Sequence, residues 1–341
     1  MLIAAILLLH AAEPAKPVAD IAGETHLSNV RQLTFGGQNA EAYWNVKGDK
    51  FCFQARYPGY PDEQIFTLPI SGGTPTLIST GKGRCTCSYY LPGDKEIIFS
   101  STHATQPGPQ PPVDYSKGYV WMVNPNYAMY KAKPDGSGLK PVIVKPGAYV
   151  AETTVAPNGK YMVWTSDFEG DLEIYRSNLN GKNVKRLTHE VGYDGGPFVS
   201  WDSKKIVYRR DVLDTPEQVE DYKSLLKQHL VRPTHMEIWV MDADGSNKKK
   251  LTDLPGASFA PFMHPNGKKI IFSSNWMNPH GRAFELYTID IDGKNLERIT
   301  YSNDFNSFAM FTRDGKKIIW ASNRYNKEPR ETNIFVADWK D

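Results

Sequence analysis

A motif that recurs along nearly the whole chain constrains its fold more than any other feature of the sequence. Each copy has a tight-turn sequence of the type Pro-Asn/Asp-Gly-Lys, followed by an apolar run that suits a β-strand. Six copies are present, and they begin at Gly48, Pro92, Pro157, Asp202, Pro265 and Asp314. Repeats of about 40 to 50 residues indicate an array built from one structural unit.

The order of segments within a copy predicts the architecture of that unit. An alternating strand, such as residues 237–242, follows the apolar run, and a second glycine turn and a closing Leu-Thr or Ile-Thr follow in most copies. A single four-stranded sheet cannot bury both of its faces, so the units must stack around an axis and close into a ring. We therefore predict an all-β, six-bladed β-propeller with four antiparallel strands in each blade.

The two ends of the chain predict how the ring closes. The last copy stops at residues 333–339 without a closing strand, whereas residues 30–34, Val-Arg-Gln-Leu-Thr, supply such a strand near the N-terminus. We expect this strand to complete the last blade. The domain prediction is a single propeller over residues 26–341, preceded by a leader over residues 1–25.

The first residues are typical of an exported protein. Residues 1–12 form an apolar run that is too short to span a bilayer, and they end in the small residues Ala11 and Ala12, which suit cleavage. We interpret residues 1–25 as a signal peptide and short leader. The mature protein is then expected to be periplasmic or secreted, with no membrane span after cleavage.

Charge and cysteine content exclude some classes of protein and leave others open. Forty basic residues balance thirty-eight acidic residues, so the broad positive field that nucleic-acid binding requires is missing. Three cysteines, Cys52, Cys85 and Cys87, are too few for a disulfide scaffold. Either Cys85 or Cys87 pairs with Cys52 across neighbouring strands, or all three are reduced thiols; the sequence leaves both alternatives open.

The repeat units resemble the PD40, or WD40-like, repeats of the TolB family, and the resemblance extends from residue 26 to the end of the chain. It implies the propeller fold but says little about function, because propeller domains of prolyl-oligopeptidase-type peptidases carry the same repeat. The sequence has no counterpart of the α/β domain that precedes the propeller in the periplasmic TolB protein. It also lacks the Gly-x-Ser-x-Gly motif of the peptidases.

Two insertions interrupt the repeat and mark one face of the predicted ring. Residues 102–118 in the second blade are rich in proline, and residues 211–235 in the fourth contain a predicted helix over 215–230. Thr215 and Gln218 have the spacing of a capping box for this helix. Both insertions follow the second strand of their blade, so they reach the same mouth of the channel. They either form the wall or lid of a ligand cleft or simply cover apolar surface of the scaffold.

Alignment of equivalent strands predicts which side chains surround this mouth. The ends of the second strands place six mostly polar residues at the rim: Arg56, Thr102, Asp167, Asp211, Asn275 and Asn323. The innermost strands place another six near the channel entrance: Glu41, Thr86, Glu152, Gly196, Ala260 and Phe308. We therefore expect any ligand site to lie at this mouth.

The candidate ligand-binding residues combine charge with aromatic surface. Arginine suits carboxylate or phosphate recognition, and aromatic rings suit stacking on sugars or peptide side chains. The candidates are Arg56, His103, Glu152, Asp194, Arg209, His235, Trp276, Arg282, Asn323 and Arg324. A divalent cation could also be held by Glu41, Glu152 and Asp194, or a transition metal by His103, His235 and His280, but solvated carboxylates and scattered surface histidines explain these residues without a metal.

Two hypotheses of function follow from these observations. The first is a non-catalytic binding or scaffold module that holds a protein, a peptide or a glycan of the cell envelope at the loop-rich face of the channel. It requires no catalytic residues, metal ligands or cofactor, and we expect a monomer. The alternative is a metal-dependent hydrolase or lyase acting on an acidic polymer. The first is favoured because no nucleophile or metal signature is present.

Overall fold

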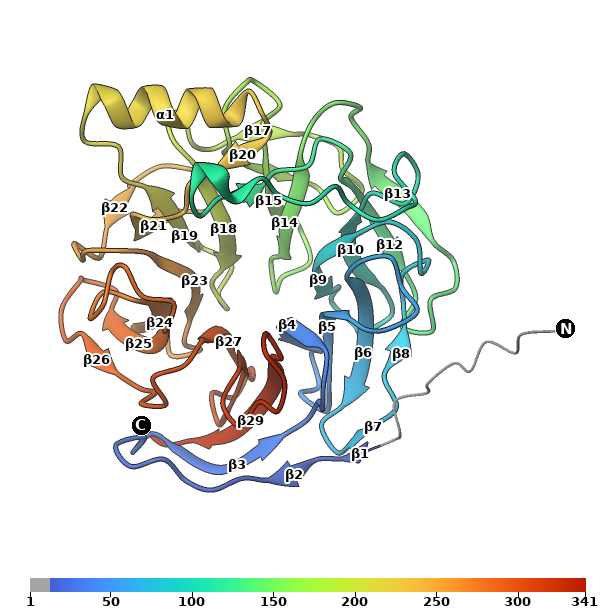
Figure 1. The fold of residues 1–341 in the computed structure, drawn as a ribbon, viewed down its shortest axis with the longest axis vertical. Coiled ribbons are helices and arrows are strands. Elements are labelled where there is room, and N and C mark those ends of the chain that lie inside the picture. The colour runs from blue at the N-terminus through green and yellow to red at the C-terminus, as the bar shows by residue number, and fades with distance from the viewer. Residues whose placement is uncertain (1–12) are drawn as a thin grey trace, which may run out of the picture.

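The chain forms the predicted six-bladed β-propeller. The computed structural model describes residues 13–341, in which six antiparallel sheets surround a central axis (Figure 1). The core of the predicted signal peptide, residues 1–12, lies outside the described residues. No helix within residues 13–341 combines the length and the apolar character needed to cross a bilayer.

Each blade consists of four strands, ordered from the channel outward. Blades 1 to 3 are β4 (Gln38–Trp44), β5 (Lys50–Arg56), β6 (Gln64–Pro69) and β8 (Thr76–Leu77); β9 (Cys85–Tyr90), β10 (Ile97–Ser101), β12 (Ala128–Ala132) and β13 (Lys140–Ile143); β14 (Val150–Val155), β15 (Met162–Ser166), β16 (Glu173–Ser177) and β17 (Lys185–Arg186). Blades 4 to 6 are β18 (Asp194–Val199), β19 (Lys205–Asp211), β21 (Met236–Asp242) and β22 (Lys249–Lys250); β23 (Ser258–Met263), β24 (Lys269–Ser274), β25 (Glu285–Asp290) and β26 (Glu297–Arg298); β27 (Asn306–Phe311), β28 (Lys317–Ser322), β29 (Asn333–Trp339) and β3 (Leu27–Gln32).

The two sequence signatures of the repeat have clear structural roles. In the Pro-Asn-Gly-Lys turn of blade 3, Gly159 adopts a φ of 70°, and the side chain of Asn158 accepts a hydrogen bond from the Lys160 amide at 2.9 Å. The threonine of the closing Leu-Thr accepts a hydrogen bond from the third strand, as in the 2.8 Å contact from the Ile238 amide to Thr252 Oγ1. The repeat is therefore a set of local hydrogen bonds that shape each blade.

The N-terminal strand closes the ring as predicted. Strand β3 pairs with β29, and the Leu33 amide donates to the Ile334 carbonyl at 2.8 Å (Figure 1). The part of the expected leader that the structure describes also lies on the propeller, because β1 (Glu13–Pro14) pairs with β7 (Gly72–Gly73) and β2 (Lys16–Pro17) pairs with β3. Residues 13–25 thus add a layer to the first and last blades.

The insertion in blade 4 forms a shorter helix than predicted. Helix α1 spans Pro216–Leu226, and its capping box between Thr215 and Gln218 is confirmed. The helix ends before residue 230 because the chain turns at His229, which has a φ of 56°, and then enters strand β20 (Leu230–Val231).

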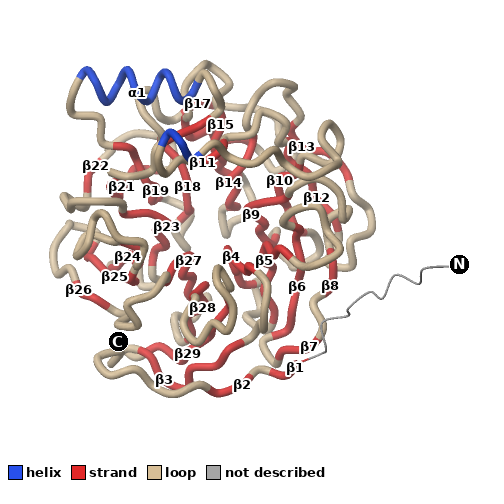
Figure 2. Tube along the Cα trace, in the orientation of Figure 1, coloured by secondary structure: helices blue, strands red, loops and turns tan. Residues whose placement is uncertain are grey.

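Both insertions meet above the channel through a two-stranded ribbon. Strand β20 pairs with β11 (Trp121–Met122), which belongs to the long link between β10 and β12 in blade 2. We call residues 113–124 of this link the strap; a short 3₁₀ helix, η1 (Tyr115–Lys117), lies within it. Figure 2 shows the loops of this link running from blade 2 toward α1, across the mouth on the side of blades 3 and 4.

Candidate functional site: a roofed cavity in the propeller channel

A β-bulge in every innermost strand directs one residue of each blade into the channel. The pairing with the second strand skips two residues in all six blades, and the first of the two adopts a left-handed conformation with φ between 50° and 60°. These six residues, which we call the bulge ring, are Glu41, Cys87, Glu152, Gly196, Ala260 and Phe308. The alignment that placed Thr86 in this ring was wrong by one residue, because Thr86 pairs with Ser100 before the bulge begins.

The bulge ring forms part of a cavity of about 320 Å³ at the mouth of the channel. All six ring residues line it, together with the strap and the residues that flank the inner strands. Nine of the lining side chains are aromatic: Tyr43, Tyr115, Trp121, Tyr127, Tyr149, Tyr193, Phe198, Phe259 and Phe308. Its volume lies near the lower end of the range for small-molecule sites.

The strap forms a partial roof over this cavity and is held from both ends. The ring of Trp121 packs edge-on against Phe259 of blade 5, with the centroids 6.0 Å apart, and the guanidinium of Arg209 lies 5.7 Å from the Trp121 ring. Arg232, just after β20, donates to the Lys117 carbonyl at 2.7 Å. The two insertions lie at the same mouth of the channel, as the sequence predicted, and the strap, but not α1, lines the cavity.

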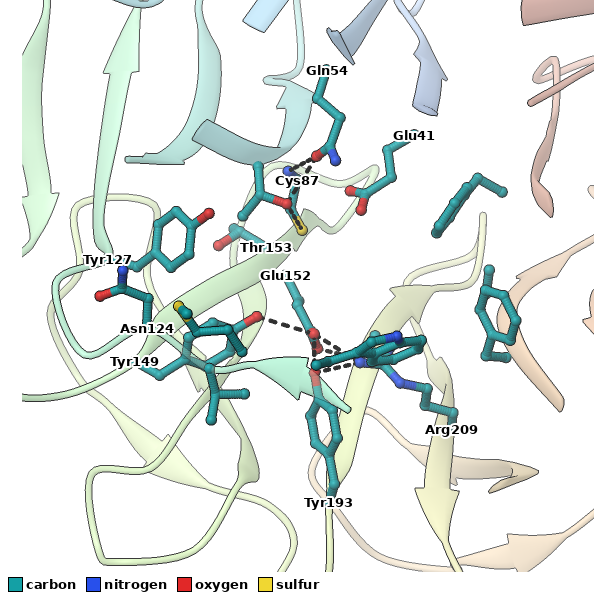
Figure 3. A pocket seen from close by; sticks show the side chains of 18 of the residues that line it. Glu41, Gln54, Cys87, Asn124, Tyr127, Tyr149, Glu152, Thr153, Tyr193 and Arg209 are labelled. Atoms are coloured by element: carbon teal, nitrogen blue, oxygen red, sulfur yellow. Dashed lines mark hydrogen bonds and ion pairs between the residues drawn. The ribbon is translucent and has the colours of Figure 1, made fainter. Parts of the chain in front are cut away.

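A buried ion pair between blades 3 and 4 forms one wall. Arg209 Nη2 lies 2.7 Å from Glu152 Oε1, which also accepts hydrogen bonds from the hydroxyls of Tyr149, at 3.2 Å, and Tyr193 (Figure 3). Glu152 Oε2 accepts the Gly196 amide at 2.6 Å. Burial alone would raise the pKa of Glu152, but Arg209, Tyr193 and Gly196 outweigh it and hold this pKa below its ordinary value. Glu152 is therefore ionised and has no free oxygen.

Two adjacent glycines create the space that this ion pair occupies. A Cβ on Gly196 would lie 2.1 Å from Arg209 Nη1, and a Cβ on Gly195 would lie 2.6 Å from Glu152 Oε2. Both distances are below van der Waals contact, so any side chain at either position would displace the pair. The ion pair can therefore form only because Gly195 and Gly196 have no side chains.

Glu41 differs from the other charged groups of the cavity. Its Oε2 is buried and has no hydrogen-bond partner, whereas Arg84 pairs with Glu63 at 2.8 Å and Arg209 pairs with Glu152. Burial raises the pKa of Glu41 from 4.5 to about 7; hydrogen bonding with Cys87 opposes this shift, and the neighbouring Glu152 adds to it. Figure 3 shows the Glu41 carboxylate near Cys87, apart from the network around Glu152. Glu41 is the one charged lining residue that forms no ion pair within residues 13–341.

Of the ten candidate ligand-binding residues, the structure brings Glu152 and Arg209 together in the cavity. Asp194 is buried nearby at the start of β18, where burial raises its pKa well above the ordinary value, with Arg210 at 3.8 Å. Arg56 and Arg282 are exposed at the surface of blades 1 and 5.

Two candidates in blade 6 are tied into the scaffold. Asn323 Oδ1 accepts a hydrogen bond from the Phe305 amide at 2.7 Å. Most residues at the aligned rim position bond in the same way to the backbone at the start of the inner strand beside them. Arg324 is 1% exposed and forms two hydrogen bonds, of 2.8 and 3.0 Å, with Glu24 of the N-terminal segment. Trp276 packs against Tyr287 beside the third strand of blade 5.

The candidate histidines occupy separate places. The ring of His103 packs at a tilt against that of Tyr130, with the centroids 4.4 Å apart, and burial lowers the pKa of His103. His235 lines a second cavity of about 120 Å³ beneath α1, together with Asp211. Within the described part of the chain, no group of three or more His, Cys, Asp or Glu side chains is arranged to hold a metal ion. All three cysteines are free thiols.

Several residues that define the cavity were not among the candidates predicted from the sequence. Tyr149 and Tyr193 each precede the innermost strand of their blade, and a comparison of that position across blades would have found them. Trp121 lies in an aromatic-rich stretch over residues 119–130, but its place over the channel depends on the pairing of β11 with β20. No signal in the sequence indicates that pairing.

Comparisons with known proteins identify the fold. No family model matches the chain. An uncharacterized protein of Agrobacterium fabrum is 27% identical over 132 residues, which are 38% of this chain and 36% of that protein, so the match spans about a third of the relative's length. A TolB-like protein from Agrobacterium tumefaciens has a TM-score of 0.57 at 18% identity, with 89% of this chain and 91% of that chain covered.

Two further solved structures show the same architecture. TolB from Acinetobacter baumannii has a TM-score of 0.57 at 16% identity over 90% of this chain and 65% of that one. An oligogalacturonate lyase in complex with manganese has a TM-score of 0.53 at 11% identity, with 97% and 98% of the two chains covered. At these identities the likeness concerns the fold, which is that of the TolB-like six-bladed propellers.

Proposed function

We propose that this TolB-like propeller is a non-catalytic binding or scaffold module that holds a protein, a peptide or an envelope glycan at the loop-rich face of its channel. The observation that carries the proposal is the partly roofed cavity of about 320 Å³, lined by nine aromatic side chains. Rings of this kind bury large apolar area at low entropic cost and stack on sugar rings and peptide side chains.

The surface around the strap extends this aromatic character beyond the cavity. The side chains of Tyr115 and Tyr119 are 64% and 52% exposed. Tyr115 also lines the cavity, so buried and exposed aromatic surface are continuous there. A ligand larger than the cavity would place one end inside and contact these rings with the remainder.

The proposed setting is the periplasm or the exterior of the cell, with the protein as a monomer. The apolar run of residues 1–12 and the likeness to proteins designated TolB support export. Fractionation of cells that express the full chain tests the location, and mass spectrometry of the mature N-terminus tests cleavage. A full-length chain in the cytoplasm would contradict export.

The Ala260→Phe variant tests the binding site directly. Ala260 has a φ of 50°, and Phe308 occupies the equivalent position of blade 6 at 56°, so the backbone conformation accepts phenylalanine. The added ring would fill the cavity without changing the rim. We expect wild type to enrich ligands from a display library of short peptides or an array of envelope glycans, and we expect Ala260→Phe to retain none of them. Ligands bound equally by both proteins would overturn the proposal.

The enzymatic alternative rests on the likeness to oligogalacturonate lyase structures. The donors of the cavity do not fit a manganese site, because the oxygens of Glu152 already accept hydrogen bonds from neighbouring groups and the described residues contain no group of three donors. Incubation with oligogalacturonides and measurement of ultraviolet absorbance from an unsaturated product tests this alternative. Product formation that depends on added metal would favour it.

A further inference from the structure

One charged side chain of the cavity has no ion-pair partner among the described residues. Of the four charged side chains that line it, Arg84, Glu152 and Arg209 are in ion pairs, whereas Glu41 is not. Glu41 Oε2 is buried without a hydrogen-bond partner. A buried polar atom with no partner loses its hydration without compensation, so it marks a place where a ligand donor can bind.

The bulge ring divides the cavity into two chemically different halves. Three consecutive blades contribute the polar residues Glu41, Cys87 and Glu152, and the next three contribute Gly196, Ala260 and Phe308. With Glu152 neutralised by Arg209, the polar half retains the single negative charge of Glu41. A complementary ligand would carry a positive hydrogen-bond donor at one end and an apolar group at the other.

We propose that the cavity recognises a protonated amine attached to a compact apolar group, with the Glu41 carboxylate accepting the ammonium hydrogen bonds. This inference rests on the binding function proposed above and names the ligand chemistry of the same site. Two sources share this chemistry, a free small amine and the amino terminus of a peptide, and the experiment below distinguishes them.

The aromatic lining supports a cationic ligand. Tyr43 belongs to the same inner strand as Glu41, and the ring of Phe308, with Phe259 packed against it, lines the apolar half of the cavity. Aromatic faces attract ammonium groups, and the attraction is strongest where water is excluded. An anionic ligand would instead face the unpaired carboxylate.

The ionisation of Glu41 gives the binding a distinctive pH dependence. Its pKa of about 7 means that the carboxylate is mostly protonated at pH 6 and mostly ionised at pH 8. The other titratable groups facing it keep their charge in this range: the pKa of Glu152 is lowered, and the pKa values of Cys87 and Tyr43 are raised well above their ordinary values. The guanidinium of Arg209 stays charged throughout. Affinity for an alkylamine such as 2-phenylethylamine, which stays protonated over this range, should therefore increase about tenfold from pH 6 to pH 8.

The test compares an amine with a neutral molecule of nearly the same shape. Isothermal titration calorimetry would measure binding of 2-phenylethylamine and 2-phenylethanol to wild type, Glu41→Gln and the charge-matched surface control Glu328→Gln, whose side chain is exposed. We expect the amine to bind wild type and Glu328→Gln at least tenfold more tightly than the alcohol does. In Glu41→Gln the amine should lose at least tenfold in affinity, and the alcohol should be unchanged.

The two sources of the amine are separated with a short peptide. Phe-Gly-Gly with a free amino terminus and the same peptide with an acetylated terminus would be titrated alongside the small amine. Tighter binding of the free peptide than of 2-phenylethylamine indicates a peptide terminus, and the reverse indicates a small free amine; loss of binding on acetylation is expected in both cases.

Failure of this inference is distinguishable from failure of the proposed function. Equal affinity for the amine and the alcohol, or an amine affinity that is unchanged in Glu41→Gln, overturns amine recognition while leaving the cavity as a binding site. If Glu41→Gln does not fold, the wild-type pH profile decides, and a flat profile between pH 6 and 8 overturns the inference. If no probe binds wild type and no library ligand is lost in Ala260→Phe, the proposed function itself fails.

Discussion

Replacing Arg209 with methionine tests whether the ion pair with Glu152 supports the wall of the cavity. Methionine keeps much of the apolar bulk that packs near Trp121 and Tyr193, but it leaves Glu152 without a counter-charge in a buried site. Removing one partner of a buried pair typically costs about 3–5 kcal/mol. Because Tyr149, Tyr193 and the Gly196 amide would still donate to Glu152, we expect the lower end, about 3 kcal/mol.

The pH dependence of this loss follows from the sign of the pKa shift. In wild type the pKa of Glu152 lies below its ordinary value, so its contribution to stability is present above the unfolded-state pKa and disappears as the pH falls. Without Arg209, burial raises the pKa of Glu152 instead, and the variant recovers part of its deficit when the carboxyl is protonated. The difference between the two proteins should be greatest at neutral pH and should shrink toward pH 4.

Urea unfolding at several pH values measures these differences. The double variant Arg209→Met/Glu152→Gln should be more stable at neutral pH than Arg209→Met alone, because it no longer buries an unpaired charge. Arg282→Met, at an exposed arginine of blade 5, serves as the control and should remain within about 0.5 kcal/mol of wild type. A loss below about 1 kcal/mol in Arg209→Met, or no recovery in the double variant, would refute the reasoning.

Three further predictions concern stability. Since the pKa of Glu41 in the folded protein is raised to about 7, wild type should lose stability as the pH rises from 4.5 to 7. Glu41→Gln should remove this pH dependence and be about 1–3 kcal/mol more stable than wild type at pH 8. Thermal melts measure the difference, and equal melting temperatures at pH 8 would contradict the prediction. Gly196→Ala should lower the free energy of unfolding by about 2–4 kcal/mol, because its Cβ collides with Arg209. The control Gly170→Ala has a φ of 92° and open space around it, so it should lose only about 1–2 kcal/mol through backbone strain. Similar losses for both variants in urea titrations would argue against the collision. Arg324→Met should release the N-terminal segment from the last blade, because it removes the two hydrogen bonds to Glu24. In limited proteolysis, residues 13–25 of the variant should be cleaved well before those of wild type. Equal cleavage rates would show that strand pairing alone holds the segment.

The repeat and the capped helix were predictable because they depend on local chemistry, and the closure of the ring was predictable because one member of the repeat was missing at the end of the chain. The turn at Asn158 and Gly159 and the capping box at Thr215 are formed by residues within a few positions of one another. The strand over residues 30–34 was recognisable as the missing member of the last copy. A period that recurs six times reinforces each of these local signals.

Two predictions from the sequence were wrong: the extension of the helix to residue 230, and the placement of Thr86 among the residues that face the channel. The helix stops at Leu226 because the following residues pair with a strand from blade 2, a contact between segments about 100 residues apart. All six inner strands carry the bulge, and the alignment of equivalent strands identified five of the six residues at its first position; in blade 2 it gave Thr86 instead of Cys87.

The amino-acid sequence by itself thus determined the blades, their number and the way the chain closes, since turn chemistry and strand periodicity act over short distances. Only the tertiary structure decided which side chains form the cavity, because they come from six blades and one long insertion. It also decided their state: Glu152 is satisfied by Arg209 and three further donors, while Glu41 is half-buried, with one buried carboxylate oxygen, and has no counter-charge. Burial and pairing are properties of neighbours brought together by folding, and no local pattern records them.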